Sequence, residues 1–193
     1  MADLSLDPTT TALIVIDLQR GIVARPAAPH SASDVVGRCA RLTEAFRHEK
    51  ALVILVHVAF SDDEGDRLKP AADSAPPAGP VPSDWSEIVP EIGPHPGDIV
   101  IVKRQWGAFY GTGLELQLRR RGVRTIVLGG IATNFGVEST ARDAYERGFE
   151  QIFVEDAMSG LTAGAHEFAV TTIFPRIGRV RSTGDVLAAI RAR

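Results

Sequence analysis

The chain near its N-terminus reads Thr11-Ala12-Leu13-Ile14-Val15-Ile16, an almost continuous apolar run rich in β-branched residues, and it ends abruptly at Asp17. A strand with one solvated face alternates apolar and polar residues, whereas a continuous run is typical of a strand buried on both faces. The segment therefore predicts an interior strand of a parallel sheet, followed at once by an acidic residue.

Five further runs of the same kind follow, the last of them weaker, and they cover residues 51–58, 98–102, 125–128, 151–154 and 178–181. Between the runs, apolar residues recur every three or four positions, which is typical of helices packed on a core. We expect these helices over residues 35–46, 114–121, 135–147, 163–173 and 183–192. Strands that alternate with helices form right-handed βαβ units. The pattern predicts a three-layer α/β/α sandwich.

Local signals refine these helices. Thr112 and Glu115 have the spacing of a capping box, in which the two residues satisfy each other's backbone N–H groups at a helix start. Thr183 can cap the last helix. In the helix over residues 135–147, the apolar spacing places Tyr145 on the buried face.

Composition narrows the class of protein. The 193 residues include 21 Lys and Arg against 24 Asp and Glu, and this balance argues against a nucleic-acid binder. The length suits a single domain over residues 1–193. A charged fraction of 23% and an apolar fraction of 45% exclude a disordered or fibrous chain. Without a long apolar run or a secretory leader, we expect a cytoplasmic protein with no membrane partner.

The sole cysteine, Cys39, can form neither an internal disulfide nor a thiolate zinc cage, so a reducing compartment is expected. The five histidines are dispersed along the chain, and none forms a close pair with metal-ligand spacing. We therefore expect no metal and no other cofactor.

Residues 61–97 stand apart from the rest of the chain because they hold eight of the twelve prolines. A loop of this length inside a compact domain is usually functional or mobile. Two interpretations stay open: a lid or subunit-contact arm over the site, or an ordinary surface excursion.

Chemistry is expected where the parallel strands end, because ligands of open α/β sheets bind outside the carboxyl ends of the strands. Asp17 follows the first strand, Lys103 follows the third, and residues 129–133 lead from the fourth into a helix N-terminus, which favours anions. The motifs of a phosphate-binding loop, a dinucleotide site and a serine-hydrolase elbow are absent from the sequence.

Three motifs carry a family resemblance, and they read LIVIDLQ at residues 13–19, VK at 102–103 and GIATNFGVESTARDA at 130–144. In this order they resemble the isochorismatase-like (cysteine) hydrolase family. The resemblance implies a three-layer fold around a mostly parallel six-stranded sheet, a small-molecule substrate, and a homodimer or homotetramer.

Most members of that family use an Asp, Lys and Cys triad. The resemblance assigns the first two roles to Asp17 and Lys103, but the position of the nucleophilic cysteine is Gly136. A glycine closes the covalent thioester route. Cys39 does not replace the missing thiol, since its spacing places it on the apolar face of a helix.

Isochorismatases proper also resemble this chain in carrying glycine at that position, and they cleave a vinyl ether. That chemistry needs a general acid, and Asp17 is the candidate. Burial would raise the pKa of Asp17 and Lys103 would lower it, so we expect Lys103 to orient Asp17 or a substrate carboxylate. The alternatives are an amidohydrolase that lost its nucleophile and a non-catalytic small-molecule binder.

Further residues are expected to bind the substrate. They are polar or aromatic residues near the strand ends and residues of the turn after the fourth strand: Gln19, Trp106, Tyr110, Ile131, Ala132, Thr133 and Phe135. The resemblance also implies a cis peptide between Ile131 and Ala132, with backbone N–H groups that hold a carboxylate or carbonyl.

Overall fold

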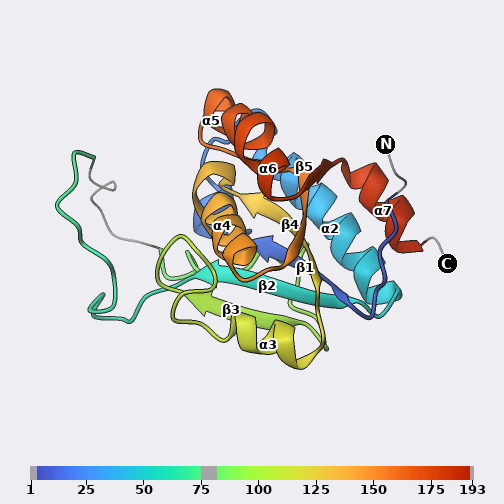
Figure 1. Ribbon diagram of the computed structural model, residues 1–193. Coiled ribbons are helices and arrows are strands. Elements are labelled where there is room, and N and C mark those ends of the chain that lie inside the picture. Colours follow the sequence, from blue (N-terminus) through green and yellow to red (C-terminus); the bar gives the residue numbers. More distant parts are fainter. Residues whose placement is uncertain (1–3, 75–81, 192–193) are drawn as a thin grey trace.

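The computed structural model describes residues 4–74 and 82–191, and these form one six-stranded sheet of parallel strands in the order β3-β2-β1-β4-β5-β6 (Figure 1). The strands are β1 (Thr11–Ile16), β2 (Leu52–Val58), β3 (Ile99–Lys103), β4 (Thr125–Ile131), β5 (Glu150–Ser159) and β6 (Arg179–Arg181). Each of the six expected runs is a strand, and the predicted fold class is confirmed.

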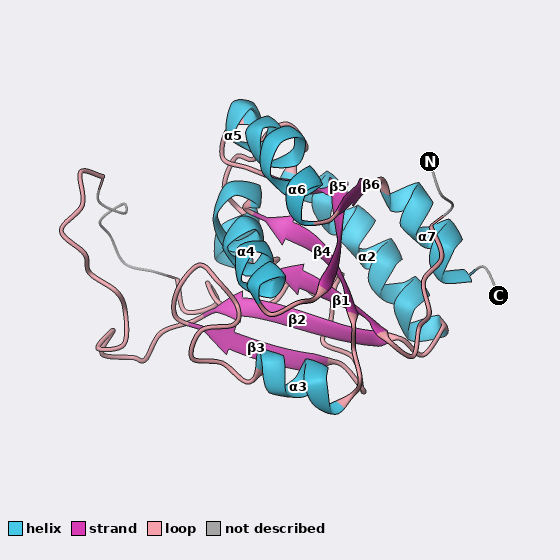
Figure 2. Ribbon diagram, viewed as in Figure 1, coloured by secondary structure: helices cyan, strands magenta, loops and turns pink. Residues whose placement is uncertain are grey.

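Helices cover both faces of the sheet (Figure 2). They are α1 (Arg20–Val23), α2 (Ala32–His48), α3 (Leu114–Arg120), η1 (Thr133–Val137, a π-helix), α4 (Glu138–Glu146), α5 (Ala163–Phe168), η2 (Ala169–Ile173, a π-helix), α6 (Phe174–Ile177) and α7 (Thr183–Arg191). No helix among the described residues combines the length and apolar character that a bilayer crossing requires.

Strand β1 shows why its sequence is apolar throughout. Leu13 and Val15 belong to the core cluster shared with α2 and α7. Ala12, Ile14 and Ile16 belong to the cluster on the opposite face, which includes side chains of α3, α4 and α6. Since successive side chains of a strand point to opposite faces, both faces of a central strand must be apolar when helices cover both.

Three local expectations are wrong. The capping box does not form, because α3 begins after Gly113 and the Glu115 carboxylate pairs with Arg147 instead. Ser182, not Thr183, accepts the N–H of a first-turn residue of α7. Tyr145 is 56% exposed, since the helix it belongs to buries a narrower face than its spacing predicts.

The chain order reverses between β1 and β4, because β2 and β3 lie on one side of β1 and β4 to β6 on the other. Such a switch point is where α/β sheets bind ligands. Gly130 lets the two strands meet there: its φ is +122°, and a Cβ on it would stand 2.1 Å from the Ile16 carbonyl oxygen. A side chain cannot be accommodated at this position.

The proline-rich segment divides into two parts, with residues 75–81 outside the described residues. Up to residue 74 the chain runs away from the helices and strands (Figure 1). After residue 82 it returns and pairs with the chain that follows β1, since Gly21 N–H donates to Trp85 O at 3.0 Å and Val89 N–H to Leu18 O at 3.0 Å. This returning part therefore braces the residues next to Asp17.

Candidate active site

A buried ion pair lies at the switch point. Lys103 Nζ donates to Asp17 Oδ2 at 2.7 Å and to the Trp106 carbonyl oxygen at 2.7 Å. Asp17 is 6% exposed and Lys103 is 2% exposed. Residues far apart in sequence, at the ends of β1 and β3, are thus brought into direct contact, as the strand-end argument predicts.

Asp17 has two unusual properties. It adopts a left-handed backbone conformation (φ 53°) directly after β1, and such residues are concentrated at functional sites. Burial raises the pKa of its carboxyl from 3.8 to about 6, while the charge and hydrogen bond of Lys103 oppose the rise. Burial is the larger effect. Among the described residues, Asp17 Oδ1 has no hydrogen-bond partner.

Gly136 lies against this pair. A Cβ on it would stand 2.9 Å from Asp17 Oδ2, 2.9 Å from Ile16 Cγ2 and 3.3 Å from Lys103 Nζ. The ion pair occupies the space that a side chain at this position would need. The structure therefore brings together Asp17, Lys103 and Gly136, as expected from the sequence motifs.

The turn after β4 completes the site. The Ile131–Ala132 peptide is cis, as the resemblance implied. The Ala132 carbonyl oxygen accepts the N–H groups of Phe135 at 3.1 Å and Val137 at 3.2 Å, and so begins η1, which continues into α4. The helix therefore starts at Thr133, two residues before the predicted start. Thr133 is fully buried, and its Oγ1 hydrogen-bonds with His166 Nδ1 at 2.9 Å.

The Gln19 side chain hydrogen-bonds with backbone groups of two segments next to the site. Its Nε2 donates to the carbonyl oxygens of Val58 at 3.0 Å and Trp85 at 3.2 Å, and its Oε1 accepts the Val58 N–H at 2.8 Å. The side chain is fully buried. Both Nε2 hydrogens are in use, so Gln19 fixes the end of β2 to the returning proline-rich segment, and the expected substrate contact is not part of this geometry.

The three expected aromatic residues are placed differently from one another. Trp106, whose carbonyl binds Lys103, makes an edge contact with Phe135 at 4.8 Å between ring centroids. Trp106 is 63% exposed, so this pair borders the site at the surface. Tyr110 is 76% exposed in the single chain, and its place in the wall of a pocket stays a prediction.

Cys39 is confirmed as a core residue. It is fully buried within the α2 face of the core, and its thiol donates to the Ala157 carbonyl oxygen at 3.4 Å. Burial raises the pKa of the thiol to about 12, with the negative charge of Asp156 adding to the rise. A thiol that stays protonated is a poor nucleophile, and Cys39 plays no part in the site.

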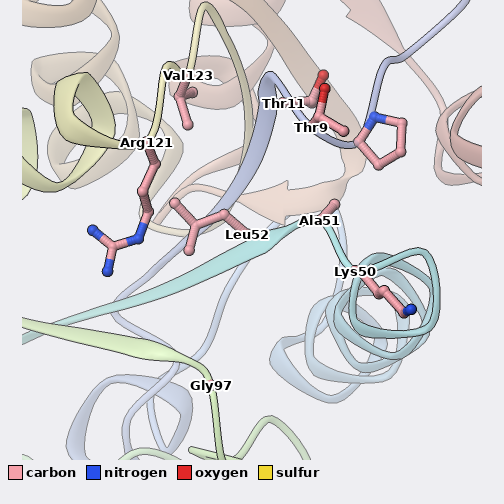
Figure 3. Close-up of a pocket in the computed structure, with 9 residues that line it drawn as sticks. Thr9, Thr11, Lys50, Ala51, Leu52, Gly97, Arg121 and Val123 are labelled. Carbon is pink, nitrogen blue, oxygen red and sulfur yellow. The ribbon is translucent and has the colours of Figure 1, made fainter.

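A surface pocket lies at the opposite end of the sheet, where the strands begin (Figure 3). It is lined by residues at the amino ends of β1 and β2, including Thr11, Lys50 and Leu52, and by Arg121. Ligand sites of parallel sheets form at the carboxyl ends of strands, and neither Asp17 nor Lys103 lines this pocket. We therefore place the active site at the buried pair and not in this pocket.

Comparison with known proteins identifies the family of this chain. The isochorismatase domain model matches residues 11–185. The isochorismatase family protein YecD of Escherichia coli O157:H7 is 50% identical over 187 residues, covering 97% of this chain and 100% of YecD. The structure of an isochorismatase family protein from Burkholderia thailandensis superposes with a TM-score of 0.94 at 47% identity, covering 99% of this chain and 100% of that one.

A more distant relative is named for an enzymatic activity. The ureidoacrylate amidohydrolase RutB of Methylobacterium radiotolerans is 34% identical over 180 residues, covering 80% of this chain and 69% of RutB. The match of the domain model over nearly the whole chain, together with the full-length relatives, identifies the family. This chain belongs to the isochorismatase family of hydrolases.

Proposed function

We propose that the protein hydrolyses a small carboxylate- or carbonyl-bearing molecule by general acid catalysis from Asp17, without a covalent enzyme intermediate. The placement of Gly136 carries the proposal: its backbone stands against both Asp17 and Lys103, and it has no side chain to act as a nucleophile. Covalent catalysis needs an activated side-chain nucleophile within reach of the base. The carboxyl group of Asp17 is therefore the reacting group.

The state of Asp17 supports an acid role. A general acid is most effective when its pKa lies near the working pH, and burial raises that of Asp17 to about 6. Lys103 Nζ binds Oδ2, so the proton belongs on Oδ1, the oxygen without a hydrogen-bond partner among the described residues. Lys103 acts by holding the carboxyl group in this orientation.

A vinyl ether is the substrate class that fits an acid without a nucleophile. Asp17 protonates the terminal methylene carbon, and the electron pair of the ether oxygen stabilises the resulting oxocarbenium ion. Water adds to the cationic carbon and returns a proton to the Asp17 carboxylate. The hemiketal then releases an alcohol and a ketone, which is pyruvate when the substrate is an enolpyruvyl ether. We expect the first N–H groups of η1 to bind the substrate carboxylate.

Turnover of isochorismate tests the proposal, with pyruvate release measured by a coupled lactate dehydrogenase assay. Asp17→Asn should lower kcat by about 10²–10⁴-fold, the usual contribution of general acid catalysis. Asp98→Asn is the matched control, because the Asp98 side chain is also buried and ion-paired, with Arg47 at 2.8 Å, but lies outside the site. Full turnover by Asp17→Asn, or no pyruvate from the wild type, would contradict the proposal.

The second candidate is a small-molecule binder of the amidohydrolase type. It is favoured by the similarity to RutB and by the surroundings of residue 136, where a side chain would contact both a carboxylate and an ammonium group. Such surroundings activate a thiol. Tight binding of ureidoacrylate without turnover, together with ureidoacrylate hydrolysis by Gly136→Cys, would support this candidate over the first.

A further inference from the structure

A second group of polar side chains lies beside the turn after β4 and consists of His30, Glu155 and His166, here termed the histidine cluster. His30 Nε2 lies 3.1 Å from Glu155 Oε1, and His166 Nε2 lies 3.5 Å from the same oxygen. One donor atom from each residue lies within 4.8 Å of the other two. The histidines that look dispersed in the sequence therefore share one carboxylate, and the reason for expecting no metal site does not hold.

An irregularity in β5 directs Glu155 into the cluster. Leu128 pairs with Phe153, but Gly130 pairs with Met158, so β5 advances by five residues where β4 advances by two. Bulged strands of this kind re-aim side chains and are frequent next to functional sites. Glu155 lies within the extra residues and leaves the regular alternation of the strand.

Backbone contacts fix His30 opposite this bulge. Ala28 and Gly160 exchange two backbone hydrogen bonds, at 3.0 Å and 2.9 Å. The Ser159 hydroxyl donates to the His30 carbonyl oxygen at 2.7 Å. The loop that carries His30 is therefore attached to the end of β5, and the cluster is held before any ligand arrives.

His166 supplies the observation that points to a ligand. It is 3% exposed, and its Nε2 has no hydrogen-bond partner among the described residues, although it faces Glu155 Oε1. His166 Nδ1 and Thr133 Oγ1 share a hydrogen bond at 2.9 Å. When the ring proton is on Nδ1, the lone pair of Nε2 faces the Glu155 carboxylate oxygen at 3.5 Å, and a cation bound by both atoms would satisfy them.

We propose that His30 Nε2, Glu155 Oε1 and His166 Nε2 bind one Zn²⁺ ion. Two imidazoles and one carboxylate are a common zinc ligand set with an open fourth position. Ligands at zinc-bond lengths in a tetrahedron are about 3.4 Å apart, and the separations of 3.1 and 3.5 Å from Glu155 Oε1 fit this value. The hydrogen bond between His166 Nδ1 and Thr133 Oγ1 would hold the ring with Nε2 directed at the ion.

The ion would connect the candidate active site to three separate segments. His30 comes from the loop after α1, Glu155 from the β5 bulge and His166 from α5. Through His166 it would also fix Thr133, which lies three residues before Gly136. The proposed role is positioning of the turn after β4, and it does not depend on the reaction that Asp17 catalyses.

The test uses tag-free full-length protein that has been stripped with a chelator and then titrated with Zn²⁺ by calorimetry. We expect one ion per chain, and a rise in Tm of about 5–10 °C at a free Zn²⁺ concentration 100 times Kd. Co²⁺ as a substitute should give the visible absorption of a low-symmetry, four-coordinate site. His30→Ala and Glu155→Gln should each weaken Zn²⁺ binding at least tenfold, and Thr133→Val about 10–100-fold.

His48→Ala is the matched control, because His48 Nδ1 lies 2.9 Å from Glu49 on the surface without a second histidine. It should leave Zn²⁺ binding unchanged. His166 is so deeply buried that its variants can fail to fold, and the test therefore relies on His30 and Glu155, which are partly exposed. No saturable Zn²⁺ binding by the wild type would overturn the proposal. So would binding that survives both His30→Ala and Glu155→Gln.

Discussion

The buried pair and the histidine cluster each place one carboxylate beside the turn after β4. The two carboxylates differ in the group they are paired with and in how exposed they are. Asp17 meets a lysine ammonium group in a place where both side chains are at most 9% exposed. Glu155 is 37% exposed and meets two imidazoles, which carry no fixed charge. The Asp17 carboxylate is buried and paired with an ammonium group, whereas the Glu155 carboxylate is partly exposed and is paired with imidazoles. Breaking the ion pair of Asp17 should therefore cost more stability than breaking the contacts of Glu155.

The largest effect is expected from Lys103→Met. It leaves the Asp17 carboxylate buried without a counter-charge, and breaking a buried ion pair in this way costs about 3–5 kcal/mol. Glu155→Gln, in the presence of a chelator, should cost about 1 kcal/mol or less, because partly exposed pairs contribute little. Urea unfolding at pH 8 measures both values. Equal losses would show that the two carboxylates do not differ in this way.

The pH dependence of activity is the next largest effect. Because burial raises the pKa of Asp17 to about 6, the acid form is lost as the pH rises through that value. The kcat/KM for pyruvate release should therefore be constant below pH 6 and fall about tenfold per pH unit above it, or about 100-fold by pH 8. Rates measured from pH 5 to 8 check this. A rise with pH through 6 would make Asp17 a base and contradict the acid role.

A smaller effect is expected from a single methyl group. Gly136→Ala places a Cβ within 2.9 Å of both Asp17 Oδ2 and Ile16 Cγ2, and overpacking of this kind costs about 1–3 kcal/mol. Gly37→Ala in α2 is the matched control. Among residues 4–74 and 82–191, no heavy atom beyond the local backbone lies within 4 Å of its added Cβ, so the substitution should stabilise the helix by about 0.5–1 kcal/mol. Thermal unfolding of the two variants should give shifts of opposite sign.

The buried pair could be predicted from the sequence because topology places it. A parallel sheet brings the carboxyl ends of its strands to one end of the sheet, so the residues that end β1 and β3 lie on the same side as the turn after β4. Long apolar runs identified the strands, and a charged residue after each marked its end. That argument needs no side-chain detail, and it holds for Asp17 and Lys103, whereas Gly136 was identified only by the resemblance of its motif to the family.

The histidine cluster could not be predicted in the same way, because no periodic pattern places its members. His30 lies in a loop, Glu155 in a bulge that breaks strand alternation, and His166 in a short helix. The predicted capping box is wrong for a related reason: tertiary contacts of the Glu115 side chain compete with the local one. Gln19 was assigned to the substrate because sequence does not show that backbone groups occupy its amide.

The smallest effect on activity is expected at Cys39. Its thiol is fully buried and its pKa is raised to about 12, so it should resist iodoacetamide in the folded protein and react after unfolding. Cys39→Ala should leave kcat/KM unchanged within about twofold and cost roughly 1 kcal/mol of stability as a small core truncation. Mass spectrometry of the labelled protein and the pyruvate assay measure the two quantities. A large loss of activity without a loss of stability would mean that this thiol takes part in the chemistry, and Gly136 would no longer imply a mechanism without a nucleophile.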